Sequence, residues 1–332
     1  MLLRDRFGRV IEYLRLSVTE RCNMSCVYCV APDARSYEPR QHLLTFEEIT
    51  DVVRALARHG LRRVRITGGE PLVRPQVAEL VAMLAQIPGI TDISLSTNGI
   101  LLPRYASALK RNGLKRVNIS LDTLQPHKFR RISPAGRWEE VWEGIQTALA
   151  VGLIPVKMNC VLMKGVNDDE ILDFARLTLH QPLHVRFIEL MPIGNIGFYR
   201  QGHLFPIGEA KARCAQLGEL IPVTQGEAVG AGPADVFRLP NAQGTLGFIG
   251  ACTANFCHRC NRMRLSSDGL LYPCLGHGIH VDLKPALALP PDQREEAIME
   301  RVEQALLCKP EGHQFITVTP HATFRTMRAI GG

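Results

Sequence analysis

The sequence predicts an α/β protein built as a partial (β/α)6 barrel of the TIM type, followed by a smaller α+β C-terminal extension. Over about the first 190 residues, short runs rich in Val, Ile and Leu alternate with stretches of helical periodicity. The short runs lack polar alternation, as parallel strands buried on both faces should. After about residue 192, Gly and Pro recur and the alternation stops. We therefore expect a barrel over 1–192 and a second domain over 193–332, with a doubly wound open sheet as the alternative for the first part.

Strands and helices can be assigned in chain order within the first part. The first helix begins at a capping box formed by Thr45 and Glu48 and ends near Gly60. Further helices are expected at 75–86, 103–111, 138–151 and 168–180. The expected strands are 13–19, 63–67, 93–97, 116–121, 156–162 and 184–188. The pattern does not determine the course of residues 193–250.

Polar residues follow the predicted strands, and they come from every strand of the barrel. Barrel enzymes carry their active sites at the C-terminal ends of the strands, so these residues predict one shared site. The first strand leads to Cys22, and the second leads to Gly68 to Glu70. The third ends in Ser96 to Gly99, and the fourth ends in Ser120 and Asp122. The fifth carries Lys157 and Asn159, and the sixth gives Arg186, Glu189 and Met191.

Cys22, Cys26 and Cys29 form a Cys-x-x-x-Cys-x-Tyr-Cys run directly after the first strand. An iron–sulfur cluster normally takes four thiolates, so three would leave one iron open to another ligand. Zinc sites usually combine Cys-x-x-Cys with a second pair downstream, which this run lacks. Ten cysteines in 332 residues, without a signal-peptide pattern, do not suggest a disulfide scaffold. The run therefore predicts a cluster with an open iron.

A second set comprises Cys257, Cys260 and Cys274. Its Cys-x-x-Cys half also suits zinc, for which Cys252 or a nearby His would complete a tetrahedron. Spacing alone leaves zinc and iron–sulfur equally open. The cysteines outside both sets (Cys160, Cys214, Cys252 and Cys308) are expected to be buried apolar residues.

Composition indicates a globular protein with an anionic small-molecule ligand. Hydrophobic residues make up 46% of the chain and charged residues 21%, with a net charge of +7. The basic residues are dispersed, which favours a phosphate-bearing ligand over nucleic acid. No apolar run is long enough to span a bilayer. We expect a cytoplasmic protein, because thiols persist in a reducing compartment.

Several motifs together resemble one family. They are Tyr13-Leu-Arg-Leu-Ser17, the first cysteine run, Arg-Ile-Thr-Gly-Gly-Glu-Pro at 65–71, Arg-Phe-Ile-Glu-Leu-Met at 186–191, Phe-Cys-His-Arg-Cys-Asn-Arg-Met-Arg-Leu at 256–265, and the terminal Gly331-Gly332. The chain resembles the radical S-adenosylmethionine enzymes and, within them, the GTP 3′,8-cyclases of molybdenum cofactor biosynthesis. The match spans nearly the whole chain.

The resemblance implies a [4Fe–4S] cluster at each cysteine set, the second in the C-terminal extension. S-adenosylmethionine would bind the open iron of the first cluster, and the guanine of GTP that of the second. Residues implied at S-adenosylmethionine are Tyr28, Gly69, Ser120 and Met191. Residues implied at GTP are Arg15, Arg65, Ser96, Lys157, Arg262 and Arg264. Gly331 and Gly332 resemble a family tail that enters the site and assists turnover.

The implied reaction begins with hydrogen abstraction from the ribose 3′ carbon of GTP by a 5′-deoxyadenosyl radical. The ribose radical then adds to carbon 8 of guanine, and reduction and protonation give 3′,8-cyclo-7,8-dihydro-GTP. The implied partners are an electron donor of the flavodoxin or ferredoxin type and a downstream cyclic pyranopterin monophosphate synthase. Neither nucleic acid nor a membrane is expected as a partner. The sequence leaves the oligomeric state open, with a homodimer as one option.

Two other functions remain open at this stage. One is a radical S-adenosylmethionine enzyme that modifies a peptide or RNA and uses the second cluster as an auxiliary centre. The other is a zinc-containing nucleic-acid-binding module, suggested by the net charge and the Cys-x-x-Cys motif. Metal analysis separates these, because two four-iron clusters hold about eight irons.

Overall fold

The chain folds around one twelve-stranded sheet, in the order β12-β11-β10-β1-β2-β3-β4-β5-β6-β9-β8-β7. The computed structural model describes residues 2–29, 42–224, 232–313, 315 and 327–331. The strands are β1 (Tyr13–Ser17), β2 (Arg63–Thr67), β3 (Asp92–Thr97), β4 (Arg116–Ser120), β5 (Val156–Leu162), β6 (Leu183–Glu189), β7 (Ile221–Pro222), β8 (Asp235–Arg238), β9 (Thr245–Ile249), β10 (Arg262–Leu265), β11 (Leu270–Tyr272) and β12 (Val281–Asp282).

Strands β1 to β6 are parallel and lie side by side in chain order, which confirms the predicted partial barrel. A doubly wound sheet would reverse its order in the middle, and this sheet does not. The barrel stays open, because β1 and β6 pair onward with β10 and β9 rather than with each other. Strands from the C-terminal part thus extend both edges of the same sheet.

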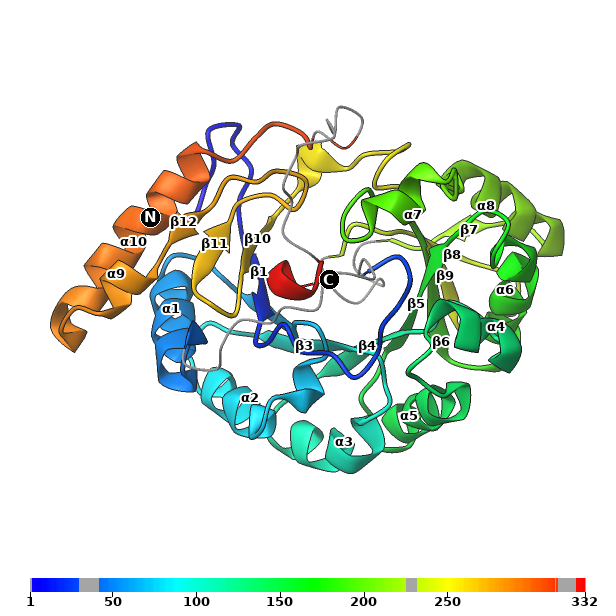
Figure 1. Cartoon of the computed structure of the whole chain (residues 1–332), viewed down its shortest axis with the longest axis horizontal. Coiled ribbons are helices and arrows are strands. Elements are labelled where there is room, and N and C mark those ends of the chain that lie inside the picture. The colour runs from blue at the N-terminus through cyan, green and yellow to red at the C-terminus, as the bar shows by residue number, and fades with distance from the viewer. Residues whose placement is uncertain (1, 30–41, 225–231, 314, 316–326, 332) are drawn as a thin grey trace.

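Helices form an outer arc around the strands of the barrel (Figure 1). The helices are α1 (Phe46–Arg58), α2 (Val77–Ala85), α3 (Leu102–Arg111), α4 (Pro126–Ile132), α5 (Trp138–Ala150), α6 (Ile171–His180), α7 (Ile196–Arg200), α8 (Ile207–Cys214), α9 (Lys284–Leu287), α10 (Pro291–Leu307) and α11 (Met327–Ile330). The main core lies between this arc and the sheet, where Val, Ile and Leu side chains of both are fully buried.

Local sequence explains the first helix. Both hydrogen bonds of the predicted capping box at Thr45 and Glu48 are present. Thr45 is the N-cap, and α1 begins at Phe46. Its apolar residues recur on one face, so that Ile49, Val53 and Leu56 pack into the core. The helical pattern did not reveal α4, a short helix whose Pro126 occupies its first turn.

Buried carboxylates tie neighbouring loops together at the C-terminal ends of the strands. Glu70, fully buried after β2, accepts from Thr97 Oγ1 at 2.8 Å and from the Asn98 amide at 2.7 Å, at the end of β3. Burial raises the pKa of Glu70 to about 7. Glu170 and Glu189 accept backbone amides of other loops in the same way. These bonds fix the rim on which the candidate site is built.

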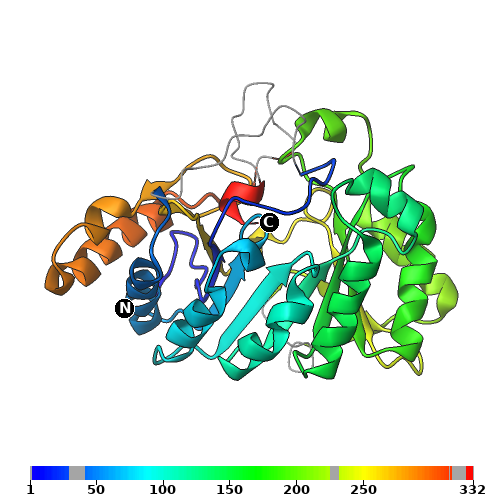
Figure 2. The same ribbon diagram turned by 60° about the horizontal axis from the view of Figure 1, so that its bottom comes forward.

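The C-terminal end of the chain returns to this rim. The short red helix α11 lies at the centre of the arc in Figure 1, and Figure 2 shows it above the strands, beside the blue segment that follows β1. Within the described residues, no helix has both the length and the apolar character required to span a membrane.

Candidate active site

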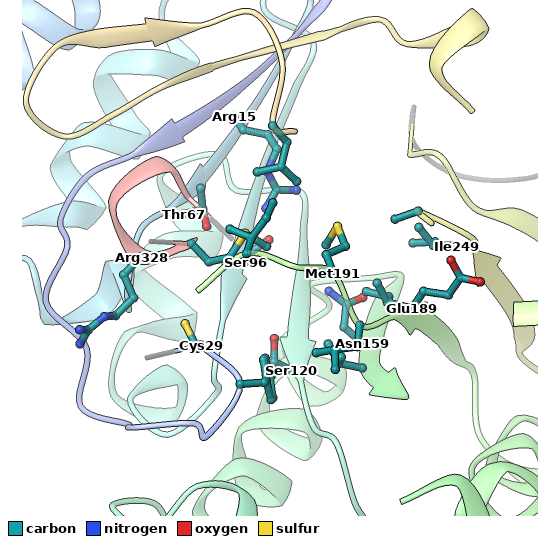
Figure 3. Close-up of a pocket in the computed structure, with 18 of the residues that line it drawn as sticks. Arg15, Cys29, Thr67, Ser96, Ser120, Asn159, Glu189, Met191, Ile249 and Arg328 are labelled. Atoms are coloured by element: carbon teal, nitrogen blue, oxygen red, sulfur yellow. The ribbon is translucent and has the colours of Figure 1, made fainter. Parts of the chain in front are cut away.

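Both cysteine sets line one cavity of about 320 Å³ at the C-terminal ends of the barrel strands. The predicted residues that line it with them are Arg15, Tyr28, Arg65, Gly69, Ser96, Ser120, Met191, Arg262 and Arg264. Figure 3 shows Arg15, Ser96, Ser120 and Met191 around the opening, with Cys29 to one side. The structure thus brings together residues from β1, β2, β3, β4, β10 and the loops between them.

Cys22, Cys26 and Cys29 lie on the loop that leaves β1, and local hydrogen bonds hold them. The Met24 amide donates to Cys22 Sγ at 3.4 Å, and Cys26 Sγ lies 2.9 Å from Ser133 Oγ, at the end of α4. Burial raises the pKa of Cys26 well above its usual range and that of Cys29 to about 12. These thiols therefore favour their neutral form unless a bound cation stabilises the thiolates.

The first set has the donor chemistry of an iron–sulfur cluster. In a four-iron cluster each thiolate ligates a different iron. The thiols of Cys22, Cys26 and Cys29 are close enough to affect one another's pKa, and all line the same cavity. Their donor chemistry and spread match a cluster with three protein ligands.

Gly69 is required by close backbone packing as well as by its place in the cavity wall. A Cβ at this position would lie 2.5 Å from the Arg21 carbonyl and 2.6 Å from the Glu20 carbonyl. The Gly69 amide donates to the Thr19 carbonyl at 2.7 Å. This segment leads directly into Cys22, so the glycine sets the position of the first cysteine loop.

Tyr28 lines the cavity with its ring and anchors its hydroxyl elsewhere. Tyr28 Oη donates to Asp122 Oδ2 at 2.8 Å, and the Val161 amide donates to Asp122 Oδ1 at 2.9 Å. Burial raises the pKa of Asp122 to about 6, while these bonds oppose that effect. Asp122 therefore orients the aromatic ring within the cysteine loop.

Cys257 and Cys260 line the cavity from the segment just before β10, and Cys274 lines it from the segment after β11. Burial raises the pKa of Cys274. Burial acts in the same direction on Cys260, but the charges of Lys309 and Arg262, with others nearby, outweigh it and lower the pKa. This second set has the same donor chemistry as the first and also faces the cavity, so it fits a second three-cysteine cluster.

Five arginines line one part of the cavity, which we call its floor: Arg15, Arg65, Arg186, Arg262 and Arg264. Burial, with neighbouring arginines, lowers the pKa of Arg65 to about 10 and that of Arg186 to about 9. Arg262 Nε is buried and has no hydrogen-bond partner among the described residues. Clustered cations in a low-dielectric interior are costly without an anion, and guanidinium groups match phosphate oxygens. The floor is therefore suited to a polyphosphate.

Lys157 is buried on β5 but is not among the residues lining the cavity wall. Its side chain belongs to the same group of charges as Arg65, Arg116 and Arg186. Burial, followed by these three arginines, lowers the pKa of Lys157 to about 6. The ammonium is thus discharged near neutral pH unless an anion binds close to it.

Gly331 of the C-terminal tail does not itself line the cavity, but it contacts Arg264, which does. The Gly331 carbonyl accepts from Arg264 Nη1, and the Gly331 φ of +79° is one that favours glycine. Gly331 itself is buried against Thr67 of β2. Gly332, which was predicted together with Gly331, lies outside the described residues.

Sequence reasoning missed two titratable cavity residues of the C-terminal part, Arg328 and His313. Arg328 lines the cavity beside the first cysteine set, where its charge opposes the effect of burial on the Cys22 and Cys29 pKa values. His313 also lines the cavity. No strand-end pattern marks either residue, and only proximity to the terminal glycines pointed to the Arg328 region. Cys160 and Cys214 are buried as expected, whereas the expectation was wrong for Cys308, which is exposed after α10, and Cys252 is only half-buried.

Comparison with known proteins agrees with this arrangement. Residues 16–178 match the Radical SAM superfamily, and residues 183–315 match Molybdenum Cofactor Synthesis C. The chain is 48% identical to a GTP 3′,8-cyclase of Pelotomaculum thermopropionicum, over 99% of this chain and 100% of the relative. It is 41% identical to a GTP 3′,8-cyclase of Listeria monocytogenes, over 100% of this chain and 99% of the relative.

Solved structures show the same fold at low identity. Streptococcus suis SuiB bound to S-adenosylmethionine aligns with a TM-score of 0.60 and 14% identity, over 93% of this chain and 74% of that one. The anSMEcpe structure with bound AdoMet aligns with a TM-score of 0.53 and 14% identity, over 89% and 82%. With full-length relatives above 40% identity and both domain matches in order, the chain belongs to the GTP 3′,8-cyclase family of radical S-adenosylmethionine enzymes.

Proposed function

We propose that this protein converts GTP to (8S)-3′,8-cyclo-7,8-dihydroguanosine 5′-triphosphate, the first step of molybdenum cofactor biosynthesis. The observation that carries the proposal is a single cavity lined by two separate cysteine sets and a buried arginine group. Full-length relatives that bear the name GTP 3′,8-cyclase support it. S-adenosylmethionine bound at a reduced [4Fe–4S] cluster supplies a 5′-deoxyadenosyl radical.

The chain divides the work between its two parts. Residues 1–192 form the radical barrel, where Cys22, Cys26 and Cys29 hold the first cluster and Tyr28, Gly69, Ser120 and Met191 surround S-adenosylmethionine. Residues 193–332 supply Cys257, Cys260 and Cys274 for the second cluster, near the base of GTP. Arg15, Arg65, Ser96, Lys157, Arg262 and Arg264 hold the triphosphate and ribose, and Gly331 with Gly332 assists turnover.

The protein's own contribution is positioning and exclusion of water. Arginines on β1, β2 and β10 meet a triphosphate from several sides, which fixes the ribose relative to the wall that carries the first cysteine set. Apolar side chains such as Phe129, Ile132 and Ile188 line the cavity between the polar groups. A dry wall protects a reactive primary radical from solvent and from stray C–H bonds.

External partners follow from the chemistry. The first cluster needs an electron from a donor of the flavodoxin or ferredoxin type, and the cyclic product is taken on by a cyclic pyranopterin monophosphate synthase. Clusters ligated by thiolates persist under reducing conditions, so we place the reaction in the cytoplasm. A homodimer is the assembly we propose to test by light scattering.

The test is anaerobic incubation of the reconstituted, reduced protein with GTP and S-adenosylmethionine. We expect about eight irons in the protein, and 5′-deoxyadenosine together with a cyclised nucleotide identified by mass. Cleavage of S-adenosylmethionine without a nucleotide product would favour the peptide- or RNA-modifying alternative. Abundant zinc with little iron would favour a binding module instead.

Lys157 makes the affinity for GTP depend on pH. Its pKa of about 6 in the free protein rises when a triphosphate binds nearby, so binding above pH 6 takes up a proton. The affinity should therefore fall as pH rises, approaching about tenfold per pH unit until the pKa of the complex is reached. Calorimetry between pH 7.5 and 8.5 measures this slope. Lys157→Met should bind more weakly and with a flatter pH dependence, and an unchanged slope would contradict the assignment.

A further inference from the structure

Lys309 is a fully buried lysine at the back of the second cysteine loop. It follows α10, whose last residue is Leu307, and only 1% of its surface is exposed. Lysine is among the residues that are least often buried, because its ammonium loses hydration there. A lysine held in the interior therefore needs partners for all three of its donors.

The three N–H donors of the Lys309 ammonium meet three partners, all in or directly beside the segments that carry the second cysteine set. Lys309 Nζ lies 3.0 Å from the Arg262 carbonyl and 3.6 Å from Cys260 Sγ, and it also donates to the Pro273 carbonyl. We call the segment 257–262, which carries Cys257 and Cys260, the first arm of the ligand loop, and the segment 273–274 the second arm. Cys260 and Arg262 belong to the first arm, and Pro273 directly precedes Cys274 on the second. One ammonium thus joins the two arms whose cysteines must converge.

The backbone of the same region is also held by Arg9, whose side chain is buried. Its guanidinium donates to the Cys257 carbonyl at 2.8 Å and to the Pro310 carbonyl at 2.6 Å. The segment after α10 is therefore joined to the second cysteine set at two points. Lys309 contacts it directly, and Arg9 bridges Pro310 to Cys257. Of the two, only Lys309 contacts a sulfur.

The charge of Lys309 lacks a compensating anion among these three partners until the loop binds a metal. Two are neutral carbonyls, and the third is a thiol that becomes a thiolate when it ligates iron. A buried cation hydrogen-bonded to a ligand sulfur stabilises negative charge on that sulfur and on the cluster. Hydrogen bonds to the sulfurs and nearby charge are the main protein controls on cluster potential.

We propose that Lys309 is the positioning residue of the second cluster, joining the two arms of its ligand loop and raising the cluster's reduction potential through Cys260 Sγ. This rests on the proposed function only in that Cys257, Cys260 and Cys274 hold a [4Fe–4S] cluster. The residue acts through the ligand loop, and no contact with GTP is required.

The test isolates the second cluster. In the full-length chain with Cys22, Cys26 and Cys29 replaced by alanine, reconstituted protein should retain about four irons. Lys309→Met, Lys309→Arg and Lys309→Gln are then compared for the rate of iron loss to a chelator and for the midpoint potential, followed by electron paramagnetic resonance. Lys110→Met is the matched control, because Lys110 donates to the Gly152 carbonyl in a loop between α5 and β5.

Lys309→Met should lose iron about tenfold faster and reduce at a more negative potential, because both the bonds and the charge are gone. Lys309→Arg should recover the potential at least in part, and Lys110→Met should match the parent. A potential in Lys309→Met equal to that of the parent would overturn the proposal. If that variant does not fold, Lys309→Gln replaces it, and retention of the parent potential by this uncharged variant would overturn the proposal equally.

Failure of the proposed function has a different signature. If the parent with Lys309 intact binds no iron at the second set, the cluster assignment itself is wrong and the role of Lys309 falls with it. If the parent binds iron normally and the Lys309 variants all behave like the parent, the cluster stands and the inference about Lys309 is wrong.

Discussion

Replacing Cys26 by alanine is expected to abolish cleavage of S-adenosylmethionine. Cys26 is the central residue of the first set, its sulfur is held 2.9 Å from Ser133 Oγ, and its side chain lines the cavity. With two thiolates left, the first cluster loses a third of its protein ligation. The measurement is 5′-deoxyadenosine formed by the reduced protein, with and without GTP, alongside iron content.

The matched control is Cys308→Ala, which removes an exposed thiol outside both sets. It should retain the parent's iron content and rate of S-adenosylmethionine cleavage. In Cys26→Ala we expect about half the iron to remain, since the second set is untouched. Persistent 5′-deoxyadenosine formation by this variant would refute the assignment of the first set.

Replacing Gly331 by alanine is expected to impair cyclisation far more than GTP binding. A Cβ at Gly331 would overlap Cγ2 of Thr67, and the φ of +79° costs an alanine about 1–2 kcal/mol. The tail belongs to a small cluster in which Tyr272, Ala329 and Ile330 are buried, so it should detach without unfolding the barrel. Detachment also removes the Gly331 carbonyl from Arg264, while Arg264 remains available to phosphate.

Thr67→Ser provides a rescue variant, because it deletes the methyl group that the new Cβ would meet and keeps the hydroxyl. The double variant should recover part of the cyclisation rate, and Thr67→Ser alone should resemble the parent. Equal rates of product formation in Gly331→Ala and the parent would show that the tail has no role in turnover. A matching loss of GTP affinity would instead place the tail in substrate binding.

The sequence predicts the barrel well because its signals are local. Strands β2 and β5 lie where the apolar runs placed them, and the capping box at Thr45 begins α1 as expected. The two cysteine sets could be recognised for the same reason, since ligand spacing is a short-range property of the chain. Their convergence on one cavity follows from the parallel order of the strands.

What the sequence could not provide depends on contacts between distant segments. Strand β9 was not assigned, because a five-residue run with an internal glycine is ambiguous until it pairs with β6. Lys309 meets residues 36 to 49 positions away, and no local pattern marks such a contact. Arg328 reaches the first cysteine set only because the tail folds back over the barrel.

The central claim is that each cysteine set holds a cluster with one iron left for a small molecule. The most direct measurement is the electron paramagnetic resonance spectrum of the reduced protein with S-adenosylmethionine, with GTP, and with neither, in variants that keep only one set. S-adenosylmethionine should alter the signal of the first cluster and GTP that of the second. Two spectra that stay the same whichever compound is added would contradict the account.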